Sequence, residues 1–507
     1  MRRFAAVAVA TTLLVLPACG SKTDEADRAA GITPSSALAL VSVNLSPSIA
    51  QKRDLLGIIR KFPDGREKVK GEFDDARDRL LGQLLEESGL DYATDVKPWL
   101  GKEAALVVLP PPGPGAPPLV LAMAQTGDKD KAKAAIEKAR ASGDFEGAYE
   151  IVDDFVVVSD QDDEASNQPA LEQIIAQSKK TDGALAEATK FTGVIDQLHG
   201  DRLVLGWIDA KSSLEVAEEL SGFDGAGFLR GLAQDAGVVA FDLHAEANAV
   251  VFQGAATASG EGTGSVASLT RSLPATTLAA LTMFDLGQSV AKALQALAGL
   301  GGEDVTSQFE QATGVDLETD VLSWMEGEAV VVVGPPGGDD PFPQFALVVE
   351  PTDRAGAEAG LASIRRGLAA QGLALQETQV AGAGALVAAS PVFGSVQPAM
   401  ALFPDRFVLA SSPAYLEELA RAAEPALGDA DAYRGVLGSD DEGNLGQFIL
   451  FLDPVREAIE RSVLSGADDR ASYDKEVRPN LEPLSALGGS TRRSGGYDVF
   501  EIRLTFD

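Results

Sequence analysis

The side chains best suited to proton transfer or zinc binding are scarce in this sequence. Of its 507 residues only His199 and His244 carry an imidazole. A serine–histidine–aspartate triad or a zinc site needs several groups that converge in space. Because the two histidines fall in different expected elements of the first half of the chain, we predict two separate histidines on the surface or in strands. We predict no catalytic residue and no metal ligand among them.

Acidic residues gather at two places, Asp160–Glu164 and Ser439–Asn444. Their oxygens are the hard ligands that calcium prefers, but neither stretch has the EF-hand spacing with its distal glutamate. In a chain with 76 acidic residues, solvated loops are the expected interpretation. Calcium binding at either cluster stays an open alternative.

Sequence signatures of cofactor binding are absent as well. Gly382-Ala-Gly384 has Val387 where a dinucleotide-binding loop needs its third glycine, and no phosphate loop or nucleophile elbow is present. We therefore predict no cofactor and no enzyme activity. An acidic-residue hydrolase acting on envelope glycans is kept as an alternative, because paired carboxylates leave no linear pattern.

Composition and charge exclude some partners. The chain is 45% hydrophobic, which is typical of a folded globular protein, and its formal net charge is −34. Binding to nucleic acid requires clustered Lys and Arg and a positive field, so nucleic acid is not an expected partner.

The N-terminus carries a different kind of chemistry. Arg2 and Arg3 precede an apolar run, Phe4–Leu16, which is too short to remain as a transmembrane helix. It ends in Leu16-Pro17-Ala18-Cys19 and resembles a bacterial lipoprotein signal, in which Leu16, Ala18 and Cys19 fit the recognition box. The resemblance implies cleavage after residue 18 and a diacylglyceryl group on Cys19. An ordinary secretory signal cut nearby is the alternative.

Cys19 is also the only cysteine. If it carries lipid, the mature protein has no disulfide and no zinc–cysteine site. We therefore predict a protein bound to the bacterial cell membrane by acyl chains on Cys19, on the extracytoplasmic face. Residues 1–18 would be the signal peptide and 19–31 a lipidated, flexible tether.

One distinctive stretch occurs twice. Gly89–Ala104 and Gly314–Ala329 match in their glycines, Asp and Thr positions, Trp99 and Trp324, and Glu-Ala pairs at one constant offset (324 − 99 = 225). The tryptophans could be ligand platforms in a shared cleft. The favoured interpretation is that each is a packing residue of its own lobe, beneath the strand that follows.

The match continues through strands and helices on both sides. Each copy is expected to follow the order β-α-β-β-α-β-β-α-β-α-β-β, which favours antiparallel pairing. The predicted fold is α+β with two pseudo-symmetric repeats, each a mostly antiparallel sheet packed with helices. The first lobe would cover residues 32–258, the linker 259–272, and the second lobe 273–507.

The two copies also differ. The first has a charged helical insertion around Gly65–Arg79. Asp154–Ser159 matches Arg406–Ser411 at a larger offset (406 − 154 = 252), so the second copy is expected to be longer by 27 (252 − 225) near Leu373–Pro398. We expect function where the copies differ.

The tandem alanine-rich lobes, the Asp-Val-x-x-Trp-x-x-x-Glu-Ala element and the lipoprotein signal together resemble an uncharacterised domain-of-unknown-function family of bacterial envelope lipoproteins. The resemblance implies location and architecture but no activity. The prediction is a non-enzymatic, membrane-anchored protein that binds an apolar ligand or an envelope protein. A structural envelope spacer is a further alternative.

Overall fold

A computed structural model describes residues 28–69, 73–85, 90–113, 115–143, 145–159, 164–180, 182–221, 237–258, 264–291, 305–337, 342–389, 396–421, 423–438, 443–463 and 467–507. Contacts divide the chain into two compact units. One holds the residues up to Gly260 together with Gly495–Glu501 and Phe506–Asp507, and the other holds Glu261–Ser494 and Ile502–Thr505. The last strand therefore contributes residues to both units.

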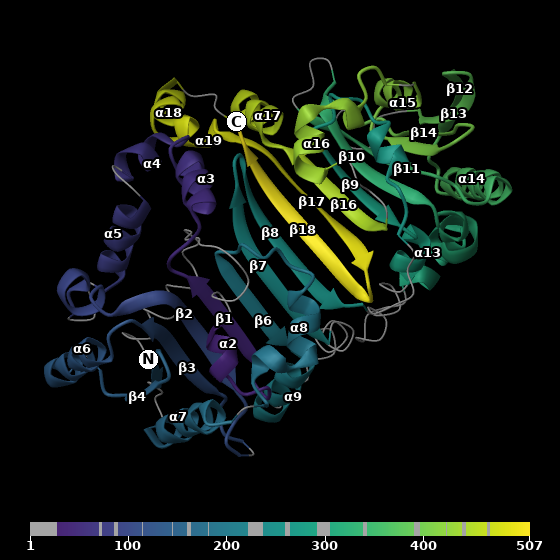
Figure 1. The fold of residues 1–507 in the computed structure, drawn as a ribbon. Coiled ribbons are helices and arrows are strands. Elements are labelled where there is room, and N and C mark those ends of the chain that lie inside the picture. Colours follow the sequence, from purple (N-terminus) through teal and green to yellow (C-terminus); the bar gives the residue numbers. More distant parts are fainter. Residues whose placement is uncertain are drawn as a thin grey trace. The chain divides into compact units, whose positions relative to one another are not determined.

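The first unit is built on antiparallel strands, coloured purple to teal in Figure 1, which pair in the spatial order β4-β5-β3-β2-β1-β6-β7-β8. Their bounds are β1 Ala39–Asn44, β2 Leu100–Leu109, β3 Leu119–Thr126, β4 Ala148–Val152, β5 Phe155–Ser159, β6 Val204–Asp209, β7 Val238–Glu246 and β8 Ala249–Thr257.

Helical segments connect these strands in the order that the sequence predicts. They are α2 Arg28–Ile32, α3 Ile49–Ile59, α4 Pro63–Lys68, α5 Phe73–Leu85, η2 Tyr92–Val96, α6 Lys129–Ser142, α7 Glu164–Ser178, η3 Leu185–Glu187, α8 Thr189–Ile195 and α9 Ala210–Ser221. Asp128 caps the start of α6, since its carboxylate accepts the Lys131 N–H.

Strands of the second unit pair in the order β12-β13-β14-β15-β11-β10-β9-β16-β17. Their bounds are β9 Ala279–Phe284, β10 Glu328–Pro336, β11 Pro343–Val349, β12 Leu375–Val380, β13 Ala383–Ala388, β14 Ala399–Leu402, β15 Phe407–Ala410, β16 Asn444–Phe451 and β17 Leu484–Ser494. The expansion predicted near Leu373–Pro398 contains the hairpin of β12 and β13.

The helical segments of this unit include α14, which lies between β11 and β12. Their bounds are α11 Ser268–Arg271, α13 Val305–Thr313, η4 Leu317–Val321, η5 Leu322–Trp324, α14 Arg354–Ala370, α15 Pro413–Ala420, η6 Leu427–Asp429, α16 Asp431–Leu437, α17 Leu452–Val463, α18 Ala467–Ser472, η7 Tyr473–Val477 and α19 Arg478–Leu481. Residues 259–263 of the predicted linker lie outside the described residues, whereas α11 falls within its second half.

The prediction of two repeats, each with its own sheet, is wrong. The strands among the described residues form one 18-stranded antiparallel sheet, although the α+β composition is as predicted. The strand that sequence comparison assigned to the end of repeat two, β18 (Tyr497–Phe506), pairs with β8, and Val499 belongs to the core of the first unit. A strand edge presents unpaired N–H and C=O groups, and here the chain terminus satisfies them.

Because side chains alternate along the strands, the sheet has two different faces. In the first unit Leu40 pairs with Trp207 on one side and with Val107 on the other, and Val107 pairs with Leu121. All four side chains belong to one core. Neighbouring residues of the same strands point to the opposite face, where α5, η2 and α6 gather. The candidate site described below lies on this second face.

The register of the strands corrects one sequence match. Ala124 pairs with Val156, whereas Val349, the counterpart of Ala124 at the constant offset (349 − 124 = 225), pairs with Phe407. Phe407 therefore corresponds to Val156 and not to Phe155. The offset at this strand is 251 (407 − 156), so the second copy is longer by 26 (251 − 225) and not by 27. Because side chains alternate between faces, a slip of one position assigns each side chain to the wrong core.

The glutamates of the duplicated Glu-Ala pairs are buried in strands and bind the start of a short helix. Glu103 accepts the Ala29 N–H of α2 at 3.3 Å. Glu328 accepts the backbone N–H groups of Leu269 and Thr270 at 2.7 and 2.8 Å, and the Thr270 hydroxyl at 2.7 Å. Each glutamate thus holds the chain that leads into β1 or β9.

Burial raises the pKa of Glu328 and outweighs these hydrogen bonds, which lower it. A carboxyl whose pKa is higher in the folded state stabilises the fold below its unfolded pKa of about 4.3. That contribution is lost as the pH rises through the folded pKa. Glu328→Gln should therefore gain stability relative to the wild type as the pH is raised from about 4 to 8. Urea unfolding across this range measures the difference.

Glu318→Gln is the matched control, because Glu318 is exposed in the same unit. Any change with pH in its stability relative to the wild type should be smaller than the change for Glu328→Gln. An identical pH trend in both variants would contradict the assignment to Glu328.

Candidate functional site

The first unit contains an apolar cavity of about 180 Å³ on the second face of the sheet. Its floor is a cross-strand row of four residues, Val41, Leu106, Ala122 and Val158, which pair in that order across β1, β2, β3 and β5. Antiparallel pairing places these side chains in direct contact range on one face. The floor therefore follows directly from the register of the sheet.

Helical segments supply the remaining wall. Leu81 and Leu85 come from α5, Ala135 and Ile136 from α6, and both helices contact η2. The segment η2 is a short π-helical turn whose start is capped by Asp91, which accepts the Thr94 N–H at 2.8 Å. The predicted charged insertion around Gly65–Arg79 includes the first half of α5, and the second half of that helix supplies Leu81 and Leu85 to the lining.

Tyr92 and Trp99 are the aromatic residues of the lining, and their polar atoms are already bonded. The Tyr92 hydroxyl donates to Asp78 Oδ1 at 2.9 Å, and Trp99 Nε1 donates to the Asp95 carbonyl at 2.7 Å. Every other lining side chain is Val, Leu, Ile, Ala or Met. The described residues of the lining therefore present hydrocarbon surface, and the side-chain polar atoms of Tyr92 and Trp99 already have partners.

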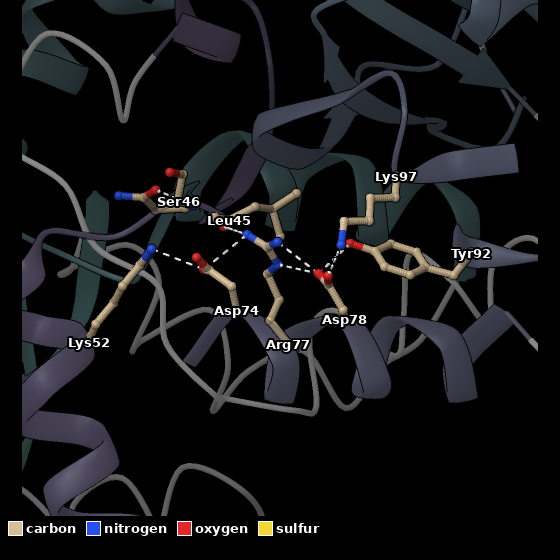
Figure 2. A network of polar contacts seen from close by, with 9 residues as sticks. Leu45, Ser46, Lys52, Asp74, Arg77, Asp78, Tyr92 and Lys97 are labelled. Carbon is tan, nitrogen blue, oxygen red and sulfur yellow. Dashed lines mark hydrogen bonds and ion pairs between the residues drawn. The ribbon is translucent and has the colours of Figure 1, made fainter. Parts of the chain in front are cut away.

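A network of charged residues borders the cavity and holds α5 in place (Figure 2). Arg77 Nη1 donates to the Leu45 carbonyl at 3.0 Å, at the end of β1, and its Nη2 pairs with Asp78 Oδ1 at 2.7 Å. Lys97 Nζ lies 2.5 Å from Asp78 Oδ2. Since Leu45 and Tyr92 also line the cavity, the network ties the wall helix both to the sheet and to η2.

On the side of α3 the network continues through Asp74. Its carboxylate is 3.0 Å from Lys52 Nζ of α3 and 3.5 Å from Arg77 Nη1, as Figure 2 shows. The wall helix α5 is thus connected to α3 as well as to β1 and η2.

The electrostatics follow from these contacts. Burial raises the pKa of Asp78, but hydrogen bonds from Lys97, Arg77 and Tyr92 together outweigh it and hold that pKa below its usual range. Burial, assisted by the hydrogen bond to Asp78, raises the pKa of Tyr92 to about 12. At neutral pH Asp78 is therefore a carboxylate and Tyr92 a neutral donor.

Trp324 in the second unit has the same local bond but different surroundings. Its Nε1 donates to the Asp320 carbonyl at 3.0 Å, its side chain is fully buried, and its ring packs edge-on against Phe407 at 5.4 Å. A Cβ added at Gly360 would lie 2.0 Å from the Asp320 oxygen, so only glycine allows α14 to approach this closely. Trp324 is a packing residue, as predicted, whereas Trp99 also faces a cavity.

The histidines behave differently from the prediction. His199 and His244 do not lie apart, because their rings stack with centroids 4.2 Å apart. His244 Nδ1 is 2.7 Å from the buried Asp242 Oδ1, and Asp242 Oδ2 accepts the His199 backbone N–H at 3.1 Å. The stacked pair was not predicted because the two histidines are distant in the chain. The sequence did contain one signal of this site: Asp242 and His244 occupy alternate positions of β7, which places both side chains on one face.

Other sequence candidates fall largely outside the described residues. Leu16, Ala18 and Cys19 do so, as do Asp160–Asp163 and residues 439–442 of the acidic clusters. Asn444 is described and is buried, with its side-chain amide donating to Gln447 at 2.7 Å. Gly382 lies in the tight turn between β12 and β13 with φ of 84°. This left-handed conformation favours glycine, so the turn accounts for the residue and no cofactor is needed to explain it.

Neither a metal cluster nor a membrane span occurs in the described part of the chain. Within it, no group of three or more His, Cys, Asp or Glu side chains is arranged to hold a metal ion. Among the same residues, no helix has both the length and the hydropathy needed to span a membrane.

The antiparallel sheet, its covering helices and the apolar cavity define an α+β protein with space for a small hydrocarbon group. The chain belongs to a family described as protein of unknown function (DUF3352), whose model matches residues 4–504. The predicted resemblance to an uncharacterised domain family is thereby confirmed. No curated protein and no solved structure matches the chain.

Tyr92→Phe tests the link between the network and the cavity wall. The ring stays in the lining, but Asp78 loses one charge-assisted hydrogen bond, so unfolding should become easier by about 1–2 kcal/mol. Tyr149→Phe is the control, since its hydroxyl binds the carboxylate of Glu137 at an exposed position. Urea unfolding should show the larger loss for Tyr92→Phe, and equal losses would contradict a structural role for the Asp78 network.

Proposed function

We propose that this protein is a membrane-anchored extracytoplasmic lipoprotein that binds an apolar group in the cavity of its first unit. The observation that carries the proposal is the cavity itself, about 180 Å³ in volume and lined by apolar side chains. An engineered apolar cavity of about 150 Å³ holds benzene. The cavity therefore suits a group of about six to eight carbon atoms.

The character of the lining narrows the class of ligand. A sugar, nucleotide or peptide backbone buried here would lose its hydrogen bonds to water without replacement, because the Tyr92 and Trp99 polar atoms are engaged. Hydrolysis of glycans needs two carboxyl groups that flank the scissile bond. Among the described residues, no Asp or Glu lines this cavity, which favours binding over the hydrolase alternative.

Membrane attachment is the second part of the proposal and is supported by the sequence. The positive residues, the apolar run and the Leu16-Pro17-Ala18-Cys19 box have the order of a lipoprotein signal. Lipid on Cys19 would place the first unit close to the bilayer, because only the short segment up to Arg28 separates them. An apolar ligand is concentrated in that environment.

Ala122→Leu tests the binding site. Ala122 forms part of the floor, and Leu347 already occupies the equivalent position of the second unit (347 − 122 = 225), so a sheet of this register accommodates leucine. The larger side chain should fill the cavity and weaken the binding of toluene, a neutral probe of suitable size, by at least about tenfold. Calorimetric titration and the thermal shift caused by toluene measure the effect.

Val120→Leu is the matched control, because Val120 lies on the same face of β3, is 39% exposed and is not part of the lining. It should bind toluene as the wild type does. Failure of the wild-type protein to bind toluene, or unchanged binding by Ala122→Leu, would exclude this cavity as the site.

Cys19→Ala tests the anchor. Cells expressing the wild-type chain should incorporate labelled palmitate into the protein, and the substitution should abolish that label because no other cysteine is present. Ser21→Ala, at a nearby position of the tether, should keep it. Continued labelling of Cys19→Ala would refute a lipid on this residue.

A further inference from the structure

The charged network beside the cavity carries a net positive charge. It contains three cations, Lys52, Arg77 and Lys97, and two carboxylates, Asp74 and Asp78. The excess of one positive charge stands out in a chain with a formal net charge of −34. A local positive charge beside an apolar cavity favours a ligand with one anionic end.

Lys97 is the cation best placed to meet such an end. It lies between Val96 and Trp99 in the chain, and both of these line the cavity. Its side chain is 54% exposed, whereas those of Arg77 and Asp78 are 23% and 17% exposed. An ammonium group has three N–H donors, so contact with Asp78 leaves Lys97 able to bind a further oxygen.

Of the described residues around η2, the carboxylates Asp95 and Asp91 have partners other than Lys97. Asp95 of η2 is paired with Lys138 at 2.6 Å, so that pair adds no net charge. Asp91 caps the beginning of η2, at the opposite end of the turn from Lys97. In Figure 2 the Lys97 ammonium and the Tyr92 hydroxyl both point to Asp78, which places the cation next to an aromatic residue of the lining.

We propose that the ligand is a single-chain carboxylate of medium length, whose hydrocarbon chain fills the cavity and whose carboxylate pairs with Lys97. This inference rests on the proposed binding function and adds the chemical class of the ligand. The cavity volume of about 180 Å³ sets the length at about eight carbons, since a longer chain cannot be enclosed while its carboxylate stays beside Lys97. The ion pair between Lys97 and the ligand carboxylate is partly exposed, so it adds selectivity, and burial of the hydrocarbon chain adds most of the affinity.

Calorimetric titration of the purified protein with hexanoate, octanoate, decanoate and dodecanoate tests the chain length. Affinity should rise about fourfold for each methylene up to about eight carbons and then stop rising. A steady rise through dodecanoate would overturn the length assignment. Tighter binding of dioctanoyl phosphatidylglycerol than of octanoate would overturn the single-chain assignment.

Octanoate, octanol and octylammonium test the charge. Octanoate should bind about two- to fivefold more tightly than octanol, and octylammonium more weakly than both. Lys97→Gln should lower octanoate affinity to that of octanol without changing octanol affinity, and Lys97→Arg should restore the preference. Lys133→Gln is the matched control, since it removes one positive charge at an exposed position of α6, and it should keep the preference.

The outcomes separate the two proposals. Binding of toluene and octanol without any preference for octanoate would overturn the carboxylate assignment and leave the apolar site intact. An octanoate preference that survives Lys97→Gln would overturn the role of Lys97. If neither toluene nor any alkyl probe binds, the proposed function fails, and this inference fails with it.

Discussion

The cavity depends on one interaction, the bond from the Arg77 guanidinium to the Leu45 carbonyl at the end of β1. The apolar side chains of Leu81 and Leu85 pack α5 toward the sheet, and this bond fixes the position of the helix against the end of β1. The same guanidinium also pairs with Asp78, which in turn receives Lys97 and the Tyr92 hydroxyl. One planar cation, able to donate in several directions at once, thus joins helix, sheet and the Tyr92–Val96 turn into a single wall.

Much of this architecture could be predicted from the sequence because it is local. Strands, helices, the Asp128 cap and the packing role of Trp324 each depend on residues within a few positions of one another, where periodicity and capping rules apply. The duplicated stretch also located Trp99 and the glutamates. The structural role of the glutamates could not be predicted, because Glu103 and Glu328 accept hydrogen bonds from backbone groups much earlier in the chain, at Ala29 and Leu269.

The features that escaped prediction depend on long-range register. The sequence match aligns Phe407 with Phe155, but strand pairing aligns it with Val156, one position away. Phe155 therefore belongs to the core that contains Trp207, whereas Phe407 packs with Trp324. His199 and His244 meet only because β7 lies beside the chain that leads into β6. The cavity itself needs four strands, two helices and a turn, and no linear pattern records that combination.

The split last strand has a consequence for how the protein is made. Val499 packs in the core of the first unit, and the ring of Phe500 covers Gly254, where an added Cβ would lie 2.0 Å from it. Nearly half of the chain separates Gly254 from Phe500, so the contact closes a very long loop. During synthesis from the N-terminus the first unit has no Val499 to complete its core until residues up to Ser494 of the second unit have been made. The final closure of the first unit therefore waits for the synthesis of the second, so the two units cannot be completed strictly one after the other.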